Sequence, residues 1–471
     1  MAKVLLIQPN TDIRKRETAV EPFTPLSLIY LGTAIEEKHP VKIYDRNLNV
    51  SDMDFTNFLK DYSPDIVGFT SNTSEVLFDI IQLGQLIRKE FPNILIIVGG
   101  PHATLEPESF LQKSYIDYVI RGEGEEALLE FCETFDKNPK KLKTLKNVNL
   151  NPLRPYVEMD TLKIPNYSLI DLKRYKILYV SMNRGCPGNC TFCYNVRSWG
   201  KDGKAFVRTF GLEKSKELFR QLVEKYHFKV FSIVDDHFIT NKAYAIELCE
   251  YLRKFNIHFF CFGRADYIDD EILSALKKAG CHTVQIGIES GSQKILNFLN
   301  KQLTVETNRK AIECCKRHGI TCDASFMMGL PIEKIEDLDA TVNFIKQTKP
   351  EITNLKIYDP LPGAIIFDYC VSKGLLIKPK TLEEWADWTG NMSHVNHNVS
   401  KIPDEILLKK AEEVWGINFY KTKLKKFLFW FKIGEYRYAL KGVKRLFFDR
   451  DRIRIPGIGH LHLIETKKKE N

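Results

Sequence analysis

Apolar and polar positions alternate in blocks along the first 135 residues. Five short apolar runs, rich in β-branched and aromatic residues, are separated by stretches with helical periodicity. They cover residues 4–7, 41–44, 66–69, 94–98 and 118–120. Because short runs that are apolar throughout are typical of parallel strands buried on both faces, residues 1–135 are expected to form a doubly wound, Rossmann-like (flavodoxin-like) α/β domain.

A second series of strand-like runs follows, again separated by helical stretches. It covers residues 177–182, 229–234, 257–262, 283–288, 321–328 and 354–358. Six βα units in succession predict a partial (β/α)6 barrel over residues 176–390. Residues 136–175 lose the periodicity and carry Pro152, Pro155 and Pro165, so they are expected to form a linker. Residues 391–471 are expected to be a helical, basic C-terminal region.

The residues that follow each run of the first domain differ from those within it. In open parallel sheets, ligands bind beyond the carboxyl ends of the strands. Here these ends read QPN (8–10), DRN (45–47), TSNT (70–73), GGPH (99–102) and RGEG (121–124). Glycine lets a backbone approach a ligand closely, and amides and hydroxyls offer uncharged hydrogen bonds. A ligand site is therefore predicted there, although βα turns use the same residues without a ligand.

Composition narrows the class of protein. With 471 residues, 44% of them hydrophobic and 27% charged, the chain is expected to be globular and multidomain. The start MAKVLLIQPNTD lacks the order of a secretory signal, and no apolar run approaches the roughly 20 residues of a membrane span. A cytoplasmic location is expected, where clustered cysteines act as metal ligands or catalytic thiols rather than in disulfides.

Three cysteines fall within eight residues, directly after the first run of the second series. Cys186, Cys190 and Cys193 lie in RGCPGNCTFCYN (184–195). Thiolates select iron-sulfur clusters or zinc, and a cubane with three protein ligands keeps one iron open. Zinc remains the alternative, but it usually takes a fourth ligand and paired CxxC units. The other cysteines show no such pairing and are expected to pack in cores: Cys132, Cys249, Cys261, Cys281, Cys314, Cys315, Cys322 and Cys370.

This spacing, CxxxCxΦC with Phe192 as the aromatic residue, resembles the signature of the radical S-adenosylmethionine (radical SAM) superfamily. The resemblance implies a 4Fe-4S cluster whose open iron is chelated by SAM, and reductive cleavage of SAM to a 5′-deoxyadenosyl radical. Looser matches at later strand ends imply the SAM-binding residues. These are Phe192, Asp235, Asp236, Arg264, Glu289, Ser290 and Met327.

A doubly wound domain ahead of such a barrel resembles the cobalamin-binding radical SAM class, over roughly residues 1–390. The resemblance implies contacts to cobalamin from Asn47, Ser71, Thr73, Gly99, Gly100, Gly122 and Glu123. The common DxHxxG signature is incomplete, because Asn47 stands at the histidine position and Val50 at the glycine position. A carboxamide is a poor cobalt ligand, so ligation by histidine from this loop is excluded. Cobalamin could bind through other groups, or the domain could be an empty scaffold; His102 is expected to donate or accept hydrogen bonds rather than to ligate cobalt.

The resemblance implies an enzyme that transfers a methyl group from cobalamin to an unactivated carbon or phosphorus centre. A radical SAM cyclase, an oxidoreductase, a carbon-carbon bond former and a cobalamin or iron-sulfur sensor remain alternatives. The expected partners are a small-molecule or lipid-like substrate and a reductant such as flavodoxin or ferredoxin. Residues 421–454 carry 12 basic and 3 acidic groups among aromatic residues. That segment is expected to be a solvated helix face or a peripheral membrane contact, with nucleic acid ranked last.

Overall fold

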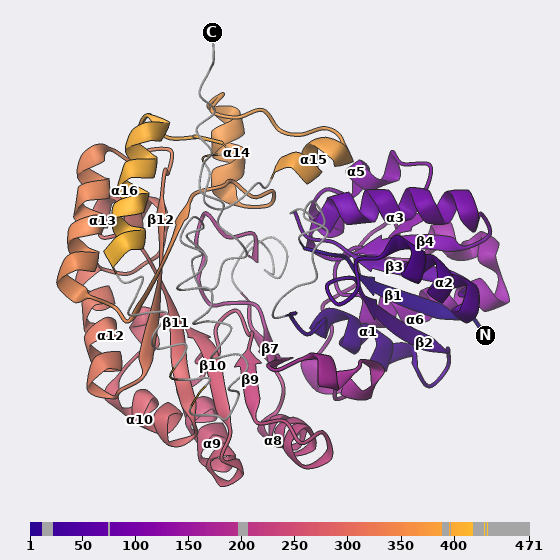
Figure 1. Cartoon of the computed structure of the whole chain (residues 1–471), viewed down its shortest axis with the longest axis horizontal. Helices are drawn as coiled ribbons and strands as arrows, with labels where there is room; N and C mark the ends of the chain where they lie inside the picture. Colours follow the sequence, from indigo (N-terminus) through magenta and orange to yellow (C-terminus); the bar gives the residue numbers. More distant parts are fainter. Residues whose placement is uncertain are drawn as a thin grey trace.

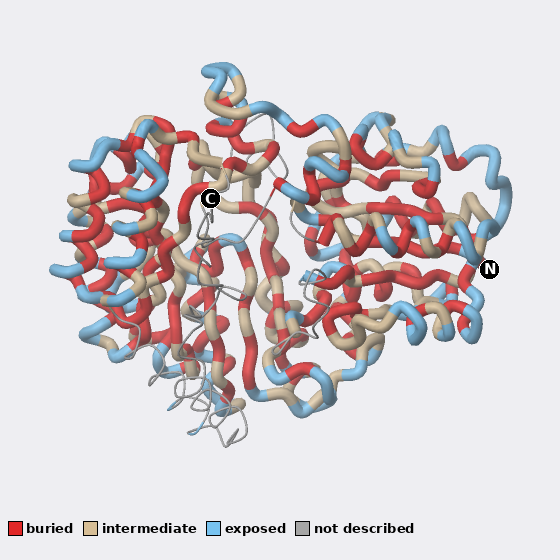
Figure 2. Tube along the Cα trace, turned by 45° about the horizontal axis from the view of Figure 1, so that its top comes forward, coloured by how far each residue is buried: buried red, intermediate tan, exposed pale blue. Residues whose placement is uncertain are grey.

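The structure is a computed structural model that describes residues 1–11, 22–73, 76–195, 206–388, 395, 397–417, 428 and 431. It consists of two α/β domains side by side, the first indigo to purple and the second magenta to orange in Figure 1. The strands of both domains are largely buried, whereas the outer sides of the helices are exposed (Figure 2). Among the described residues, no helix is long and apolar enough to cross a membrane.

The first domain is a five-stranded parallel sheet of order β2-β1-β3-β4-β5. This is the flavodoxin-like order, so the predicted doubly wound fold is confirmed. The strands are β1 (Val4–Gln8), β2 (Val41–Asp45), β3 (Ile66–Thr70), β4 (Leu95–Gly99) and β5 (Tyr118–Val119). The helices are α1 (Leu26–Ile35), α2 (Asp52–Tyr62), α3 (Val76–Glu90), α4 (Pro101–Leu105), α5 (Pro107–Leu111) and α6 (Glu125–Lys137).

Both faces of this sheet are buried, which explains why its strands read as continuous apolar runs. In β1, Val4 and Leu6 belong to one core with residues of α1 and α6. Leu5 and Ile7 belong to a second core with residues of α2 and α3. Since successive strand residues point to opposite faces, the first four positions of β1 are all apolar, and only Gln8 at its carboxyl end is polar.

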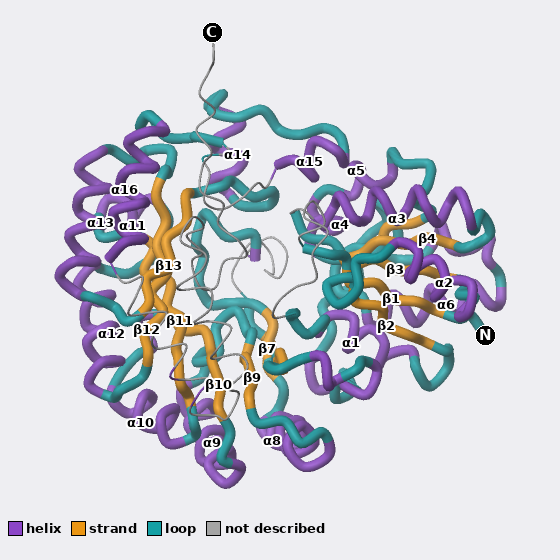
Figure 3. Tube along the Cα trace, viewed as in Figure 1, coloured by secondary structure: helices purple, strands orange, loops and turns teal. Residues whose placement is uncertain are grey.

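The second domain is a six-stranded parallel sheet of order β13-β12-β11-β10-β9-β6. Its helices lie on the outer side of the sheet (Figure 3), which confirms the partial barrel. The strands are β6 (Leu178–Val180), β9 (Val230–Ile233), β10 (His258–Gly263), β11 (Cys281–Glu289), β12 (Thr321–Met328) and β13 (Ile352–Ile357). The helices between them are α8 (Leu212–Arg220), α9 (Lys242–Leu252), α10 (Asp270–Lys278), α11 (Gln293–Phe298), α12 (Val305–Arg317) and α13 (Ile335–Thr348).

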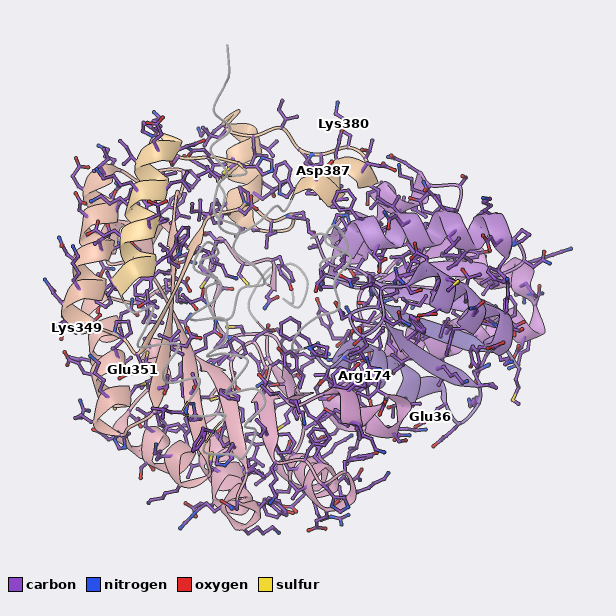
Figure 4. All side chains as sticks on the ribbon, in the orientation of Figure 1. Glu36, Arg174, Lys349, Glu351, Lys380 and Asp387 are labelled. Carbon is purple, nitrogen blue, oxygen red and sulfur yellow. The ribbon has the colours of Figure 1, made fainter. Side chains whose placement is uncertain are left out.

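Residues 136–175, expected as a linker, run along both domains through four short 3₁₀ turns. These are η2 (Pro139–Thr144), η3 (Met159–Thr161), η4 (Tyr167–Leu169) and η5 (Leu172–Arg174). Leu142 belongs to the core of the first domain, and Tyr167 to the core of the barrel. Arg174, labelled in Figure 4, donates to the Leu48 carbonyl of the first domain at 3.1 Å. The segment therefore joins the two cores rather than separating them.

The chain returns to the first domain after the last strand. It continues through α14 (Ile365–Ser372), α15 (Leu382–Trp388) and α16 (Asp404–Ile417). Helix α15, which carries the labelled Asp387 of Figure 4, packs on α3, and its Trp385 lies in the same core as Phe110. Helix α16 packs on β13 and α13. It agrees with the helical character expected of residues 391–471, whereas the basic segment 421–454 lies outside the described residues apart from Leu428 and Phe431.

Candidate active site

The three clustered cysteines lie in the loop between β7 (Asn183–Arg184) and β8 (Arg208–Thr209). These two strands form a small antiparallel ribbon that the sequence did not predict. Gly185 turns the chain from β7 into the loop with φ = 90°. A Cβ atom at this position would lie 1.9 Å from the Phe206 carbonyl oxygen, so only glycine is possible.

The three cysteines of this loop differ in exposure. Cys190 is buried, whereas Cys186 and Cys193 are partly exposed. Burial raises the pKa of Cys193 to about 12, and the neighbouring Asp236, Cys190 and Cys186 raise it further. Arg264 Nη1 lies 4.0 Å from Cys190 Sγ. Three neighbouring thiols in one loop, with a cation beside Cys190, suit a cubane with an open iron.

The eight remaining cysteines are all buried. Seven of them belong to the hydrophobic cores of the two domains, and Cys370 to a smaller cluster with Leu330 and Ile366. The predicted packing role is confirmed.

Three of the predicted SAM residues gather around the cysteines. Asp236 Oδ2 accepts a hydrogen bond from the Gly185 amide at 3.1 Å. Arg264 forms a fork on Asp266, with both N···O distances 3.1 Å. Glu289 Oε1 accepts from Lys301 Nζ at 2.8 Å. Charged groups therefore surround the loop, and two of them are already paired within the protein.

The other four predicted SAM residues differ in their burial and in the hydrogen bonds that they already make within the protein. Phe192 and Met327 are partly buried in one cluster, and Lys301 Nζ lies 5.9 Å from the Phe192 ring. Ser290 Oγ is 2.9 Å from Thr341 Oγ1 and fully buried. Asp235 Oδ1 accepts from the amides of residues 182 and 183 at 2.8 and 3.0 Å, which shapes the start of the cysteine loop. Burial raises the pKa of Asp235 to about 7, although these hydrogen bonds lower it.

A cavity of about 390 Å³ opens at the carboxyl ends of the first sheet and reaches the barrel. Its inner part lies between the sheet and helices α1 and α6, and its walls there are apolar: Leu6, Gly68, Ile97, Leu28, Leu31 and Leu128. Its outer part is lined by Gly99, Gly100, Gly122 and Glu123 of the first domain, all predicted cobalamin residues. Ser181, Asn183, Arg184, Val234 and Asp236 line it from the barrel.

The lining of this cavity, with glycines at the rim and apolar side chains inside, suits a group that carries an apolar arm. At Gly100, where φ is 96°, a Cβ atom would lie 2.6 Å from the Ser71 carbonyl oxygen, so glycine is required where the end of β4 packs against the end of β3. Pockets for cofactors are mostly apolar with a few placed polar groups. The lining has that character, with Gln8, Thr70 and Asn72 as polar groups from the first domain.

Three predicted cobalamin residues do not line the cavity. Asn47 is buried and holds its own loop, accepting from the Thr11 amide at 3.0 Å and donating to Asp45 Oδ1 at 2.9 Å. Ser71 Oγ donates to the Gly99 carbonyl at 2.7 Å. Thr73 Oγ1 is 2.8 Å from His102 Nδ1. These side chains shape the strand ends that form the rim.

His102 makes hydrogen bonds through both ring nitrogens. Its second nitrogen, Nε2, is 3.2 Å from Ser109 Oγ, and its ring meets Trp385 of α15 edge-on at 5.4 Å. Burial lowers the pKa of His102 to about 3, so the ring is neutral at physiological pH. The expectation of a hydrogen-bonding histidine is confirmed.

A buried ion-pair network joins the two domains beside the cavity. Arg184 Nη1 lies 2.6 Å from Glu123 Oε1, and Arg184 Nη2 lies 2.5 Å from Glu125 Oε1. Arg208 Nη1 lies 2.9 Å from Glu123 Oε2. The sequence offered one signal for Arg184, its place directly before the cysteine motif, but none for Arg208.

Comparison with known proteins decides the family. A model of the radical SAM superfamily matches residues 180–345, and a model of the B12 binding domain matches residues 16–131. An uncharacterized methyltransferase of Pyrococcus horikoshii is 31% identical over 395 residues, covering 80% of this chain and 84% of that protein. The chain belongs to the radical SAM superfamily, in the class with an N-terminal B12-binding domain. It is an enzyme whose cofactors are a 4Fe-4S cluster, SAM and cobalamin.

More distant relatives of this radical SAM enzyme differ in activity. The anaerobic magnesium-protoporphyrin IX monomethyl ester cyclase of Rubrivivax gelatinosus is 27% identical, covering 64% of this chain and 58% of the cyclase. The radical SAM methyltransferase TsrM from Kitasatospora setae, solved with cobalamin and a [4Fe-4S] cluster, superposes with a TM-score of 0.69. That match has 16% identity and covers 88% of this chain and 89% of TsrM, so it shows a shared fold.

Proposed function

We propose that this radical SAM enzyme transfers a methyl group from cobalamin to an unactivated carbon or phosphorus centre of a small-molecule or lipid-like substrate. The observation that carries the proposal is the position of Asp236. Its carboxylate lines the first-domain cavity and also accepts from the amide of Gly185, directly before the cysteine loop. One side chain thus belongs to both sites, which suits a reaction in which a radical and a methyl donor act on one substrate.

The proposed residue roles follow the geometry of the two sites. Cys186, Cys190 and Cys193 would hold the cluster, and the glycine backbone at Gly99 and Gly100 on the rim of the cavity would contact cobalamin. When bound, these cofactors supply a 5′-deoxyadenosyl radical and a methyl donor. The chain itself shields the reacting region, since Cys190 is buried and the Arg184 network closes the domain interface beside it. Shielding protects a reactive radical from side reactions.

The proposed SAM and cobalamin residues fall into two groups, those placed to touch a cofactor and those that hold the surrounding loops. Asp236, Arg264 and Glu289 stand beside the cysteines and are the strongest candidates for binding SAM. Gly99, Gly100, Gly122 and Glu123 are the strongest candidates for binding cobalamin. Asn47, Ser71, Thr73, Asp235 and Ser290 are assigned the indirect role of shaping strand ends and loops.

The experiment that tests methyl transfer is a measurement of cofactor content and SAM products. Protein reconstituted anaerobically is analysed for iron and corrin, reduced, and its SAM products are separated. About four irons, one corrin, and both 5′-deoxyadenosine and S-adenosylhomocysteine are expected. S-adenosylhomocysteine is decisive, because it forms only when the methyl group of SAM is transferred. Its absence in protein that contains corrin and makes 5′-deoxyadenosine would refute the proposal.

Cyclisation is the second candidate function, favoured by the similarity to the anaerobic cyclase named above. A cyclase would make 5′-deoxyadenosine with corrin bound but without S-adenosylhomocysteine. The same product analysis therefore separates the two functions.

The partner proteins and location belong to the same proposal. A flavodoxin or ferredoxin would supply the electron for SAM cleavage in a cytoplasmic setting. The basic and aromatic segment 421–454 would contact anionic lipid at the membrane surface, since cationic side chains with aromatic anchors bind such interfaces. Co-sedimentation of the full chain with vesicles of phosphatidylserine, compared with vesicles of neutral lipid, tests this contact.

A further inference from the structure

Lys301 is a buried cation that no sequence motif singled out. It lies between α11 and α12, with only 6% of its surface exposed. Its Nζ atom is 2.8 Å from Glu289 Oε1, and Glu289 is 7% exposed. Burying an ion pair is costly, so a buried pair at a candidate active site calls for a functional reason.

The backbone around this pair is strained. Glu289, Asn300 and Gln302 have φ values of 65°, 48° and 58°, in the left-handed region that non-glycine residues rarely adopt. Gly287 makes room for the pair, because a Cβ atom there would lie 2.3 Å from Glu289 Oε1 and 2.8 Å from Lys301 Nζ. Strained residues gathered at one place persist where the surrounding structure holds them and often mark functional sites.

The segment that carries Lys301 is fastened to the cysteine loop. The Thr191 amide donates to the Leu299 carbonyl at 2.9 Å, and Thr191 Oγ1 donates to the Phe298 carbonyl at 3.1 Å. Asn300 Nδ2 donates to the Asn189 carbonyl at 2.9 Å. Lys301 is therefore held in a fixed position relative to the residues on either side of Cys190.

The charges of the pair act on the Cys190 sulfur with opposite sign. Both charged groups lie within electrostatic range of the Cys190 sulfur, where the Lys301 cation stabilises negative charge and the Glu289 anion opposes it. Arg264, the other cation close to this sulfur, is balanced by its fork on Asp266 and also donates to the Lys301 carbonyl at 3.1 Å. Lys301 and Glu289 thus form a balanced source of charge beside one of the three cysteines.

We propose that Lys301 compensates the buried charge of Glu289 beside the cluster held by Cys186, Cys190 and Cys193, so that this carboxylate can be kept there without lowering the reduction potential of the cluster; Lys301 is also the positioning residue that fixes Glu289. The inference rests on the proposed cluster ligands. A cluster becomes more negative when it gains an electron, so a buried cation near its sulfur favours the reduced state and a buried anion opposes it. Because the Lys301 charge offsets that of Glu289, the cluster can still be reduced although the Glu289 carboxylate stays near the proposed SAM site.

Removing one charge at a time makes this inference testable. In the full-length protein, reconstituted anaerobically and without SAM, the midpoint potential is followed by EPR during a reductive titration. Lys301→Met leaves Glu289 unbalanced and is expected to shift the midpoint to a more negative potential. Glu289→Gln leaves Lys301 unbalanced and is expected to shift it to a more positive one. The double variant Lys301→Met/Glu289→Gln is expected to return close to the wild-type value.

The opposite signs and their cancellation separate an electrostatic role from a structural one, since misfolding would shift both variants in the same direction. Lys294→Met is the matched control, because Lys294 pairs with Asp337 but its side chain is 47% exposed; no shift is expected. Shifts of the same sign, or unchanged potentials with full iron content, would overturn the inference and leave the cluster assignment standing. Wild-type protein that binds no iron would instead refute the cluster ligands. If Lys301→Met alone loses iron, Glu289→Gln and the double variant still decide the sign.

Discussion

The first domain and the barrel form their candidate ligand sites by different physical means. The first-domain cavity is made of shape: glycine backbone at its rim and apolar side chains such as Ile97 and Leu128 in its depth. The barrel site is made of charge: Arg264 and Lys301 sit beside the cysteines, each paired with a carboxylate. Ligand binding in the first-domain cavity should therefore weaken when a larger side chain fills it. The barrel site should instead change when one partner of an ion pair is removed. Variants that respond in the opposite way would show that the two sites do not differ in this respect.

The largest effect is expected at the cysteine loop. Cys186→Ala leaves two thiolates, too few to hold the cluster, so production of 5′-deoxyadenosine should fall to background. Corrin should still bind, because most of the lining of its cavity comes from the first domain and none of it from the three cysteines. Cys132→Ala is the control, since Cys132 is fully buried in the core of the first domain. Full SAM cleavage by Cys186→Ala would contradict the assignment of the ligands.

The next effect concerns the network that joins the two sites. Glu123→Gln removes a carboxylate that pairs with both Arg184 and Arg208, so unfolding by urea should show a loss of about 3 kcal/mol at pH 7. Glu130→Gln, which affects a half-exposed pair with Arg154, should change stability little. An equal loss in both variants would show that burial of the network has no special importance.

The same network predicts a pH dependence. Burial by itself would raise the pKa of Glu123, but the hydrogen bond from Arg208 and the charge of Arg184 lower it below its usual value. A lowered folded-state pKa contributes stability above the unfolded value of about 4.3, and this contribution is lost as the pH falls through the folded value. The stability difference between wild type and Glu123→Gln should therefore shrink on acidification from pH 7 to below about pH 4. A difference that grows in acid would reverse the sign of this interpretation.

A smaller effect is expected from filling the first-domain cavity. Leu31, on α1, is partly buried and lines the cavity, so Leu31→Trp adds volume where the apolar arm of cobalamin would lie. Corrin binding should weaken on the order of a hundredfold, or about 2.7 kcal/mol, while SAM cleavage continues. Leu150→Trp, at a side chain that is 56% exposed, is the control. Unchanged corrin affinity in Leu31→Trp would move the site elsewhere.

The smallest effect is expected at Asn47, which stands at the histidine position of the incomplete signature. Its amide bonds stay within its own loop, so Asn47→Ala should lower stability by about 1 to 2 kcal/mol and leave corrin affinity unchanged. Thermal unfolding and corrin binding measured on one sample check both parts. A clear loss of corrin affinity at unchanged stability would restore Asn47 as a direct contact.

The sequence alone predicted both sheets, because their strands are short runs rich in apolar residues that alternate with helical stretches; β1, buried on both faces, shows this most clearly. It also singled out Cys186, Cys190 and Cys193, since their spacing is local and is read directly from the chain. Segment 136–175 and helix α15 could not be placed in this way. Their apolar residues follow no regular period, so the sequence does not show which element they pack against. Trp385, for example, packs on residues of the first domain that lie almost 300 positions earlier in the chain.

Only the tertiary structure decided which charged residues act together. Arg184 pairs with Glu123 of the other domain, which is distant in the chain. Lys301 pairs with Glu289 because the fold of the barrel brings the segment after α11 back to the end of β11. Hydrophobic burial is periodic and therefore visible in sequence, whereas the pairing of buried charges depends on distances of a few ångströms that a pattern does not contain. The sequence by itself determined the two folds and the cysteine motif. The packing of one domain on the other determined the shared cavity and the charges around it.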